Sequence, residues 1–275
     1  MPELPEVETI KNGIAKSIGC SRIRKVEVRQ SKLRVPVPAD IASKINGATI
    51  TKYSRRAKYI VIELDNGLSL IWHMGMSGKI LICDQLPNPL GKHDHIIIET
   101  DNGYLVYNDP RRFGLFTYAP TPELDKLPLF ANLGIEPFAK DLTADYLYNH
   151  LQKKTIPVKA ALLDQSIIVG IGNIYASEVL FATAISPLRP ADKITRQECQ
   201  DLITATQEVL TKAIKAGGST LRDYEKPDGS LGYFQNQHKV YGKEGQKCPG
   251  CTCTGGICKI VIAGRSTFYC PQKQK

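Results

Sequence analysis

The chain has 275 residues, with 36 lysines and arginines against 27 aspartates and glutamates, and a net charge of +9 at pH 7. This length accommodates two domains of ordinary size, each with its own core. No apolar run reaches the roughly 18–20 residues of a membrane span, and residues 1–20 lack the basic and apolar regions of a signal peptide. Composition therefore excludes a membrane-spanning protein and predicts a cytoplasmic one. The basic excess favours a polyanionic partner, either a nucleic acid or a membrane surface.

The first nine residues, MPELPEVET, combine prolines with three acidic side chains, Glu3, Glu6 and Glu8. Pro5 suits the first turn of a helix and the carboxylates complement the helix dipole, so an amphipathic helix is predicted over EVETIKNGIAKSI. Pro2 permits a second interpretation. Once the initiator methionine is removed, the chain begins with a secondary amine, which can attack a carbonyl carbon and form an iminium ion. Taken alone, the stretch is explained by the helix start.

Strand patterns follow from about residue 20 to residue 120. The runs KYIVIEL and LSLIWHM flank the turn at residues 65–67, and HIIIET and YLVYND flank a second turn at residues 101–103. Both turns read Asp-Asn-Gly, which is a strong hairpin signal. An antiparallel sandwich or barrel is therefore predicted, and it ends in a proline-rich stretch that places a domain boundary near residues 130–142.

Three loops of this β-rich half carry basic or apolar side chains. The run RRAKYI places Lys58 at the start of a strand, NDPRRFG places Arg111 and Phe113 in a tight turn, and HMGMSG places Met76 in a loop. Exposed cations beside an aromatic side chain suit a protein that inserts a wedge into stacked bases while it binds phosphates. For Met76 and Phe113, packing in the core is the alternative.

The second half changes to helical periodicity. Thr143 can cap a helix that runs to about Lys153, and NIYASEVLFATA predicts a helix that begins at Asn173 after the glycine turn GIG. Such a turn exposes N–H groups that can bind phosphate, although it is also common in proteins without that function. A capping box of Thr195 and Glu198 opens a further helix. Residues 219–238 predict a long loop, which is either functional or disordered.

Five of the eight cysteines lie between positions 248 and 270. Without a secretory signal, such a cluster favours a metal over disulfides. Cys248, Cys251 and Cys270 match three ligands of a zinc ribbon, but the expected fourth position holds Lys273. Cys253 or Cys258 could supply the fourth thiolate; otherwise the site has three thiolates and water, or is empty. Between the two halves of the ribbon, GRSTF places Arg265 at a hairpin tip, where it could bind phosphate or be an ordinary solvated arginine.

Together these stretches resemble the formamidopyrimidine-DNA glycosylases, also called 8-oxoguanine DNA glycosylase/AP lyases. The motifs MPELPEVET, RRAKY, GMSG, KHDH, NDPRRFG, GNIYASE, AGGSTL, VYGKEGQKC and GRSTFYC occur in order from residue 1 to residue 270. The resemblance implies a multi-domain α+β protein. It would have an N-terminal antiparallel β-sandwich flanked by helices (residues 1–135), a helix-two-turn-helix domain (136–238) and a zinc-ribbon hairpin (239–275).

The resemblance also implies a chemistry for the N-terminus. The amine of Pro2 attacks C1′ of the damaged nucleotide, Glu3 protonates the sugar or the leaving group, and Glu6 is a supporting carboxylate. Lys58 resembles the proton donor of β-elimination. Arg265 resembles the residue linked to δ-elimination, although the high pKa of arginine makes phosphate binding an equally good role.

The implied partner is double-stranded DNA that contains oxidised purines or abasic sites, bound by a monomer that carries one zinc ion. Side chains that fill the gap left by the flipped lesion would be Met76, Arg111 and Phe113, and contacts to the DNA backbone would come from His93, Lys154 and Asn173. The loop at residues 219–238 would close over the everted base. Two rival functions are an endonuclease VIII-like glycosylase for oxidised pyrimidines and a non-catalytic protein that binds damaged DNA.

Overall fold

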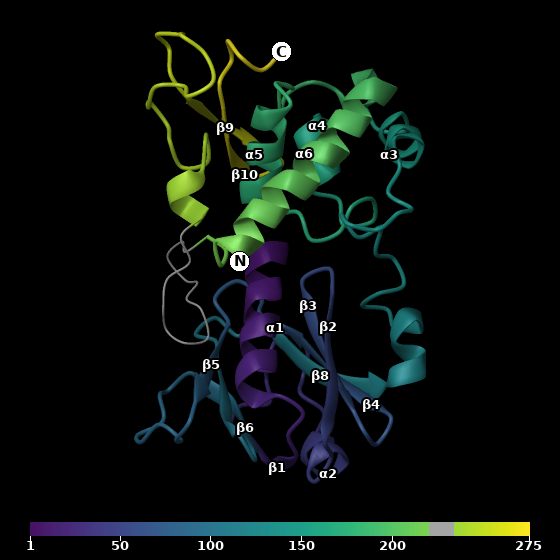
Figure 1. Cartoon of the computed structure of the whole chain (residues 1–275), viewed down its shortest axis with the longest axis vertical. Helices are drawn as coiled ribbons and strands as arrows, with labels where there is room; N and C mark the ends of the chain where they lie inside the picture. Colours follow the sequence, from purple (N-terminus) through teal and green to yellow (C-terminus); the bar gives the residue numbers. More distant parts are fainter. Residues whose placement is uncertain (220–233) are drawn as a thin grey trace. The chain divides into compact units, whose positions relative to one another are not determined.

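The computed structural model describes residues 1–219 and 234–275 (Figure 1). Its contacts divide the chain into two compact units. The first unit holds residues 1–131 and 214–235, and the second holds residues 132–213 and 236–275. The ribbon at the C-terminus thus belongs to the same unit as the helices that precede it. The predicted three-part division at residues 135 and 238 stays a prediction.

The first unit begins with the expected amphipathic helix, α1 (Leu4–Ile18). Its buried apolar side chains Val7, Ile10, Ile14 and Ile18 recur at three- and four-residue spacing, which puts them on one face. The helix lies alongside the sheets and contacts β2, β3 and β5 (Figure 1). One buried side therefore fixes the start of the chain against the β-rich core.

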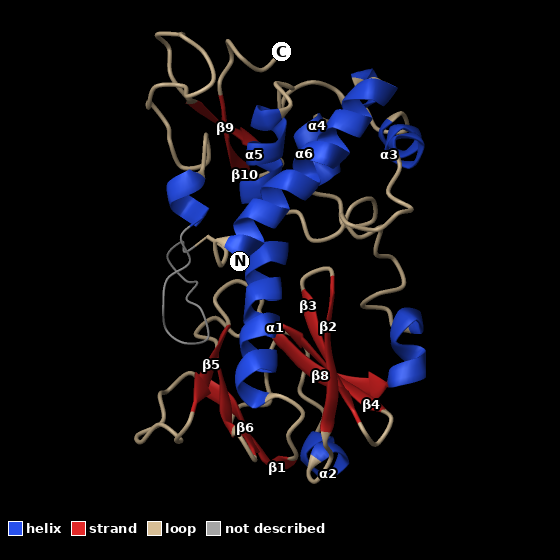
Figure 2. Ribbon diagram, viewed as in Figure 1, coloured by secondary structure: helices blue, strands red, loops and turns tan. Residues whose placement is uncertain are grey.

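Two four-stranded antiparallel sheets form the rest of the first unit (Figure 2). One sheet has the order β1-β6-β7-β5 and the other β2-β3-β4-β8. The strands are β1 (Ile23–Val28), β2 (Ile50–Arg56), β3 (Tyr59–Leu64), β4 (Leu68–His73), β5 (Lys79–Cys83), β6 (Asp94–Thr100), β7 (Gly103–Asn108) and β8 (Leu115–Pro120). A short helix α2 (Ile41–Ile45) and a 3-10 helix η1 (Thr121–Lys126) complete the unit. Side chains from both sheets and α1 share one core, so the predicted sandwich is confirmed.

The predicted turns join the strands as expected. Hairpin β3–β4 turns at residues 65–67 and hairpin β6–β7 turns at residues 101–103. At the second turn, Asn102 donates from Nδ2 to the carbonyl of Ile18 at 2.9 Å, which ties the turn to the end of α1. The turn at residues 101–103 is therefore stabilised both by its own sequence and by its contact with the end of α1.

The second unit is helical and ends in a β-hairpin. Its elements are α3 (Ala144–Leu151), α4 (Val158–Leu162), α5 (Asn173–Ala182), η2 (Ala191–Lys193), α6 (Arg196–Lys215, whose last two residues belong to the first unit), η3 (Phe234–Gln237, whose first two residues belong to the first unit), β9 (Cys258–Ile262) and β10 (Arg265–Tyr269). Nearly every side chain of α5 is buried, and β10 contacts it (Figure 2). Helix α5 is therefore the support on which the hairpin rests.

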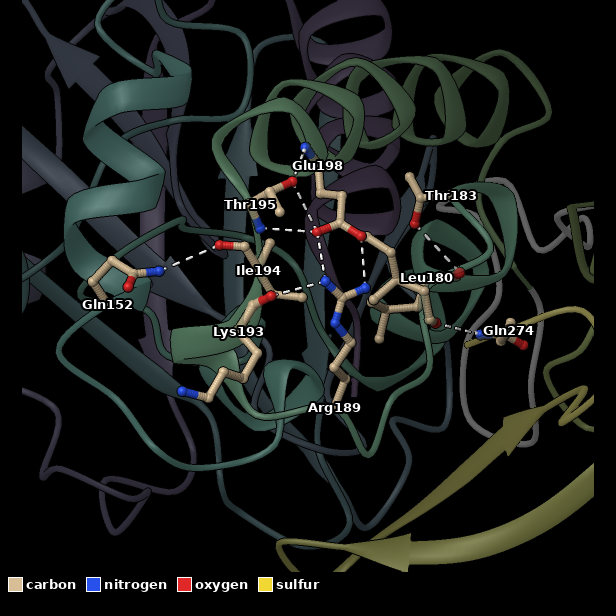
Figure 3. Close-up of polar contacts among 10 residues, drawn as sticks. Gln152, Leu180, Thr183, Arg189, Lys193, Ile194, Thr195, Glu198 and Gln274 are labelled. Atoms are coloured by element: carbon tan, nitrogen blue, oxygen red, sulfur yellow. Dashed lines mark hydrogen bonds and ion pairs between the residues drawn. The ribbon is translucent and has the colours of Figure 1, made fainter.

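The predicted helix starts are confirmed. Thr143 accepts a hydrogen bond from the N–H of Tyr146 at the start of α3. At the start of α6, the N–H of Thr195 donates to Glu198 at 2.8 Å and the N–H of Glu198 donates back to the Thr195 hydroxyl at 3.2 Å (Figure 3). Arg189 adds two hydrogen bonds to the same carboxylate, at 2.6 and 2.7 Å. Such a bidentate pair fixes the preceding loop to the helix.

Candidate active site and DNA interface

The N-terminal stretch is buried and held by a carboxylate. Pro2 is buried, Glu3 is 3% exposed and Glu6 is 2% exposed, whereas Met1 is 48% exposed. Glu6 accepts a hydrogen bond at Oε2 from the backbone N–H of Glu3 at 2.9 Å. Both residues lie in the first turn of α1, so the helix start and a fixed position for Pro2 come from the same contacts.

Glu6 also holds a distant segment of the first unit. Its Oε1 accepts a hydrogen bond from the N–H of Ser219 at 2.8 Å. Gly217 and Gly218 precede that serine with φ of +77° and +78°, a conformation that favours glycine. A Cβ on Gly218 would lie 2.9 Å from Glu6 Oε1. Gly218 and Ser219 thus bring the backbone against the carboxylate. Most of the predicted loop at 219–238 lies outside the described residues, namely 220–233.

Lys58 occupies a two-residue turn between β2 and β3, as the sequence predicted. Arg56 pairs with Tyr59, which leaves only Ala57 and Lys58 in the turn. Ala57 has φ of +52°. Arg55 stabilises this conformation, because it donates to the Ala57 carbonyl at 2.8 Å and binds a carboxylate of α1 at 3.0 Å. Lys58 is only 7% exposed, so its ammonium is held in a defined place.

His73 is a polar residue of this region that sequence reasoning missed. Its ring lies 4.8 Å from that of Tyr59, and its Nδ1 accepts a hydrogen bond from the N–H of Gly75 at 2.9 Å. Burial, together with the charges of Lys58 and Arg34, lowers the pKa of His73 to about 4. A neutral imidazole therefore sits beside the cations at neutral pH, which keeps the local charge from becoming still more positive.

The three predicted gap-filling residues lie on the surface. Met76 is 37% exposed and Phe113 is 46% exposed, so the alternative of core packing is wrong for both. The guanidinium of Arg111 lies 4.7 Å from the centre of the Phe113 ring. Their loops touch, because a Cβ on Gly75 would meet the backbone of Phe113 at 2.4 Å. The two touching loops therefore expose the apolar side chains of Met76 and Phe113 together with the cation of Arg111.

A buried carboxylate organises both loops. Asp109 is fully buried and accepts hydrogen bonds from the Ser77 hydroxyl at 2.7 Å, the Tyr107 hydroxyl at 3.1 Å and the N–H of Gly114 at 2.9 Å. Ser77 follows Met76, and Gly114 follows Phe113. This role could not be predicted from the sequence, because Asp109 resembles an ordinary turn residue in NDPRRFG.

The predicted contacts to the DNA backbone fall in both units. His93 is half-buried just before β6, and its carbonyl accepts the N–H of Asp109 at 3.0 Å. In the second unit, Lys154 follows α3 and forms an ion pair with Asp164 at 3.0 Å. Asn173 is the first residue of α5, where backbone N–H groups have no acceptor within the helix itself. Its side chain is engaged internally, because Nδ2 donates to the carbonyl of Ser266 at 2.8 Å.

Arg265 lies at the hairpin tip, as predicted. The two-residue turn of Ala263 and Gly264, with φ of +48° and +71°, separates it from Ile262. Positive φ at both positions is the requirement of a type I′ turn, which matches the twist of the two strands. The Arg265 side chain is exposed, and Arg265 is the first residue of β10.

Four cysteines of the ribbon could hold a metal ion. The sulfur atoms of Cys248, Cys251, Cys253 and Cys270 all lie within 4.8 Å of one another among the described residues, and Cys258 is outside this group. The Sγ atom of Cys270 lies 3.6 Å from that of Cys251 and 3.5 Å from that of Cys253. Tetrahedral zinc with Zn–S bonds of about 2.3 Å needs sulfur atoms about 3.8 Å apart. The donor set therefore fits such an ion.

Comparison with known proteins gives matches along the chain. Residues 1–116 match the formamidopyrimidine-DNA glycosylase N-terminal domain and residues 133–225 match the H2TH domain of the same proteins. The chain is 45% identical over 286 residues to the formamidopyrimidine-DNA glycosylase of Rhodospirillum rubrum, with both chains covered in full. Among solved structures, two of Lactococcus lactis Fpg are 35% identical and also covered in full. One is a mutant bound to Fapy-dG-containing DNA, with a TM-score of 0.92, and the other is the wild type with an oxidised-pyrimidine-containing DNA, at 0.91.

A β-sandwich combined with a helix-two-turn-helix domain and a cysteine-bearing hairpin defines a class of DNA-repair glycosylases. The chain belongs to the formamidopyrimidine-DNA glycosylase family. The predictions of family and fold are thus confirmed, and membership makes the protein a DNA glycosylase. Among the described residues, no helix has the length and apolarity to cross a membrane.

Proposed function

We propose that the protein is a bifunctional DNA glycosylase and AP lyase that excises oxidised purines, such as 8-oxoguanine and formamidopyrimidines, through an N-terminal proline. The observation that carries this proposal is the buried start of α1. Pro2 lies beside Glu3, and Glu6 fixes the backbone of Glu3 at 2.9 Å. A nucleophile and an acid held next to each other on a rigid helix start are what amine-based excision needs.

In the proposed reaction, the nitrogen of Pro2 is free because Met1 has been removed. It attacks C1′ of the damaged nucleotide, the N-glycosyl bond breaks, and the base leaves with the proton that the Pro2 nitrogen gives up. Glu3 supplies the proton that opens the sugar at O4′, which leaves an iminium ion between the Pro2 nitrogen and C1′. The cationic nitrogen withdraws electrons and acidifies the C2′ proton. Water takes that proton, and the electrons of the C2′–H bond form the double bond as the 3′ phosphate leaves by β-elimination.

Lys58 and Arg265 act on the phosphates that leave. We assign to Lys58 the proton donation in β-elimination, which is supported by its burial and its braced turn. Loss of the 5′ phosphate by δ-elimination completes the strand cleavage. Arg265 stabilises that phosphate as a fixed cation, because a guanidinium does not deprotonate near neutral pH.

Binding of the DNA is assigned to both units. Met76, Arg111 and Phe113 fill the gap left by the everted nucleotide, which is supported by the exposure of the two apolar side chains. His93 and Lys154 bind backbone phosphates, and Lys154 then exchanges its carboxylate partner Asp164 for phosphate. Asn173 binds a backbone phosphate through its own N–H at the start of α5, because its side chain is hydrogen-bonded to the carbonyl of Ser266.

Oxidised pyrimidines are the alternative substrate class. The Lactococcus lactis protein has been solved with DNA of that kind. We favour purines because the wedge of Met76, Arg111 and Phe113 is complete. A competition between 8-oxoguanine and oxidised-pyrimidine duplexes, each opposite its ordinary partner base, separates the two by the ratio of their kcat/KM values.

One zinc ion is assigned to the four-cysteine cluster, with Cys253 as the fourth ligand in place of the residue expected at position 273. The ion supplies rigidity and no catalytic step, because four thiolates leave no open coordination position. The metal stabilises a hairpin whose own apolar core is small, with Cys248, Ile257, Phe268 and Cys270 among its buried members.

Borohydride trapping tests the proposal. The protein is mixed with a duplex that has one 8-oxoguanine opposite cytosine, reduced, and analysed by intact mass and N-terminal peptide mapping. We expect a covalent adduct on Pro2 that disappears in Pro2→Gly. A protein that has lost Met1, binds the duplex and forms no adduct would instead be the non-catalytic alternative, a binder of damaged DNA.

A further inference from the structure

A lysine is completely buried in the second unit. Lys159 lies on α4 and is 0% exposed. Its ammonium donates to Asn173 Oδ1 at 2.8 Å, to the Thr267 hydroxyl at 2.8 Å and to the Ser266 carbonyl at 3.3 Å. Burying an ammonium is costly unless its N–H groups are hydrogen-bonded, so the buried Lys159 side chain depends on those three acceptors.

The contacts of Lys159 lead directly to the backbone of Arg265. The hydroxyl of Thr267 accepts from Lys159 and donates its own hydrogen to the carbonyl of Arg265 at 3.2 Å. The carbonyl of the next residue, Ser266, accepts from both Lys159 and Asn173. Two consecutive peptide groups at the tip of the hairpin are therefore held by side chains of α4 and α5.

A second attachment holds the chain that leads into the ribbon. Glu178 on α5 is 4% exposed and accepts hydrogen bonds from the backbone N–H groups of Lys239, Val240 and Tyr241 at 2.7, 3.0 and 2.8 Å. The ring of Tyr241 packs edge-on against Phe268 of β10, with centroids 5.0 Å apart. None of these contacts uses a cysteine.

The metal cluster is at the other end of β10. Cys270 follows Tyr269, five residues beyond Arg265, which corresponds to roughly 17 Å along an extended strand. Over that distance a metal can fix Arg265 only through the strand, whereas the Lys159 contacts act on the Arg265 carbonyl itself. The nearer restraint has the more direct effect on where the guanidinium points.

We propose that Lys159 is a positioning residue that holds Arg265 through Thr267, and that this restraint is independent of the metal. The inference rests on the proposed function of Arg265 in δ-elimination. Without Lys159 or the Thr267 hydroxyl, the tip of the hairpin is released from α4 and the guanidinium no longer meets the 5′ phosphate. Base excision, which depends on Pro2 and Glu3, continues.

A pair of variants at position 267 tests the restraint. Thr267→Val removes the hydroxyl with little change of shape, and Thr267→Ser keeps it. We expect Thr267→Val to slow δ-elimination by about tenfold, a size typical of a lost hydrogen bond to a charged group, and to leave the rate of the Pro2 adduct unchanged. Thr267→Ser should match the wild type, and Lys159→Met should match Thr267→Val. Exposed Lys193→Met serves as the control for removal of a lysine.

Two further measurements separate positioning from a general loss of structure. In an Arg265→Ala background, Thr267→Val should have no further effect on the elimination products, because the residue it positions is gone. Chelation of the metal from the wild type should slow δ-elimination less than Thr267→Val does. A full effect of Thr267→Val in the Arg265→Ala background would overturn the proposal. So would chelated protein whose δ-elimination is as slow as that of Arg265→Ala.

Hydrogen exchange distinguishes a failure of this inference from a failure of the proposed function. Amide exchange at residues 265–269 needs neither DNA nor turnover. We expect faster exchange there in Thr267→Val than in Thr267→Ser. Unchanged exchange would refute the restraint even in an active enzyme. Faster exchange in a protein that forms no Pro2 adduct would refute the catalytic assignment and leave the restraint in place.

Discussion

The low pKa of His73 makes stability of the first unit depend on pH. In the unfolded chain a histidine titrates near 6.5, and in the folded protein burial and the charges of Lys58 and Arg34 lower the pKa of His73 to about 4. Between these values the unfolded state binds a proton that the folded state does not. The contribution of His73 is therefore fully present above pH 6.5, is lost as pH falls toward 4, and changes no further below that.

The magnitude follows from that gap. At about 1.4 kcal/mol for each pH unit, lowering the pH from 7 to 5 should reduce the free energy of unfolding by about 2 kcal/mol, and the whole window amounts to about 3 kcal/mol at most. The perturbation that isolates the residue is His73→Asn. Its side-chain oxygen can still accept the N–H of Gly75, but it does not titrate.

Urea unfolding provides the assay, because the single tryptophan, Trp72, is buried in β4 next to His73. Unfolding of the first unit is followed by its fluorescence at pH 7 and pH 5 in both proteins. His73→Asn loses ring packing with Tyr59 and should be less stable at pH 7, but the pH-dependent loss should shrink by about 2 kcal/mol. Equal pH dependence in the two proteins would refute the reasoning.

Two further pairs of substitutions test the metal cluster and the contacts that Glu6 makes with the backbone of Glu3 and Ser219. Cys253→Ser should weaken zinc affinity by at least about 100-fold, whereas Cys258→Ser should leave it unchanged; equal effects in a zinc competition titration would contradict the assignment of the fourth ligand. Gly218→Ala and Gly242→Ala share a left-handed backbone, at φ of +78° and +76°, so backbone strain should lower Tm by about 4 °C in Gly242→Ala and by more in Gly218→Ala. Only Gly218→Ala places a Cβ against Glu6, so only that variant should slow formation of the Pro2 adduct.

Local sequence signals predicted much of the fold. The helix start at Pro5, the capping box of Thr195 and Glu198, and the Asp-Asn-Gly turns each depend on neighbouring residues, so one short stretch contains the whole signal. The exposure of Phe113 is different. A single aromatic residue in a turn is equally compatible with core and surface, and only the contacts of its loop with Gly75 decide between them.

Long-range partners could not be predicted for the same reason. Lys159 reads as one more cation in a basic chain, and nothing near it indicates that it meets Thr267, 108 positions later. His73 likewise follows a strand pattern that could end with any polar residue. Its pKa depends first on burial and then on the charges of Lys58 and Arg34, all of which result from the folding of the sandwich. The spacing of the cysteines also could not decide whether Cys253 or Cys258 is the fourth metal ligand. Which of the two lies near the other three sulfur atoms depends on the path of the chain between the two halves of the ribbon.

Position 273 holds a lysine, and side chains other than that of residue 273 hold the turn after β10. Gln274, which is labelled in Figure 3, is 2% exposed. It accepts the N–H of Cys270 at Oε1 at 2.9 Å and donates from Nε2 to the carbonyl of Ile185 at 2.9 Å. A thiolate at position 273 would join this turn to the rest of the ribbon through the metal. Gln274 joins it instead to the loop that follows α5, and in the proposed site the fourth ligand is Cys253, whose sulfur lies 3.5 Å from that of Cys270. Gln274 therefore holds the turn, whereas the proposed fourth metal ligand is a different residue, Cys253.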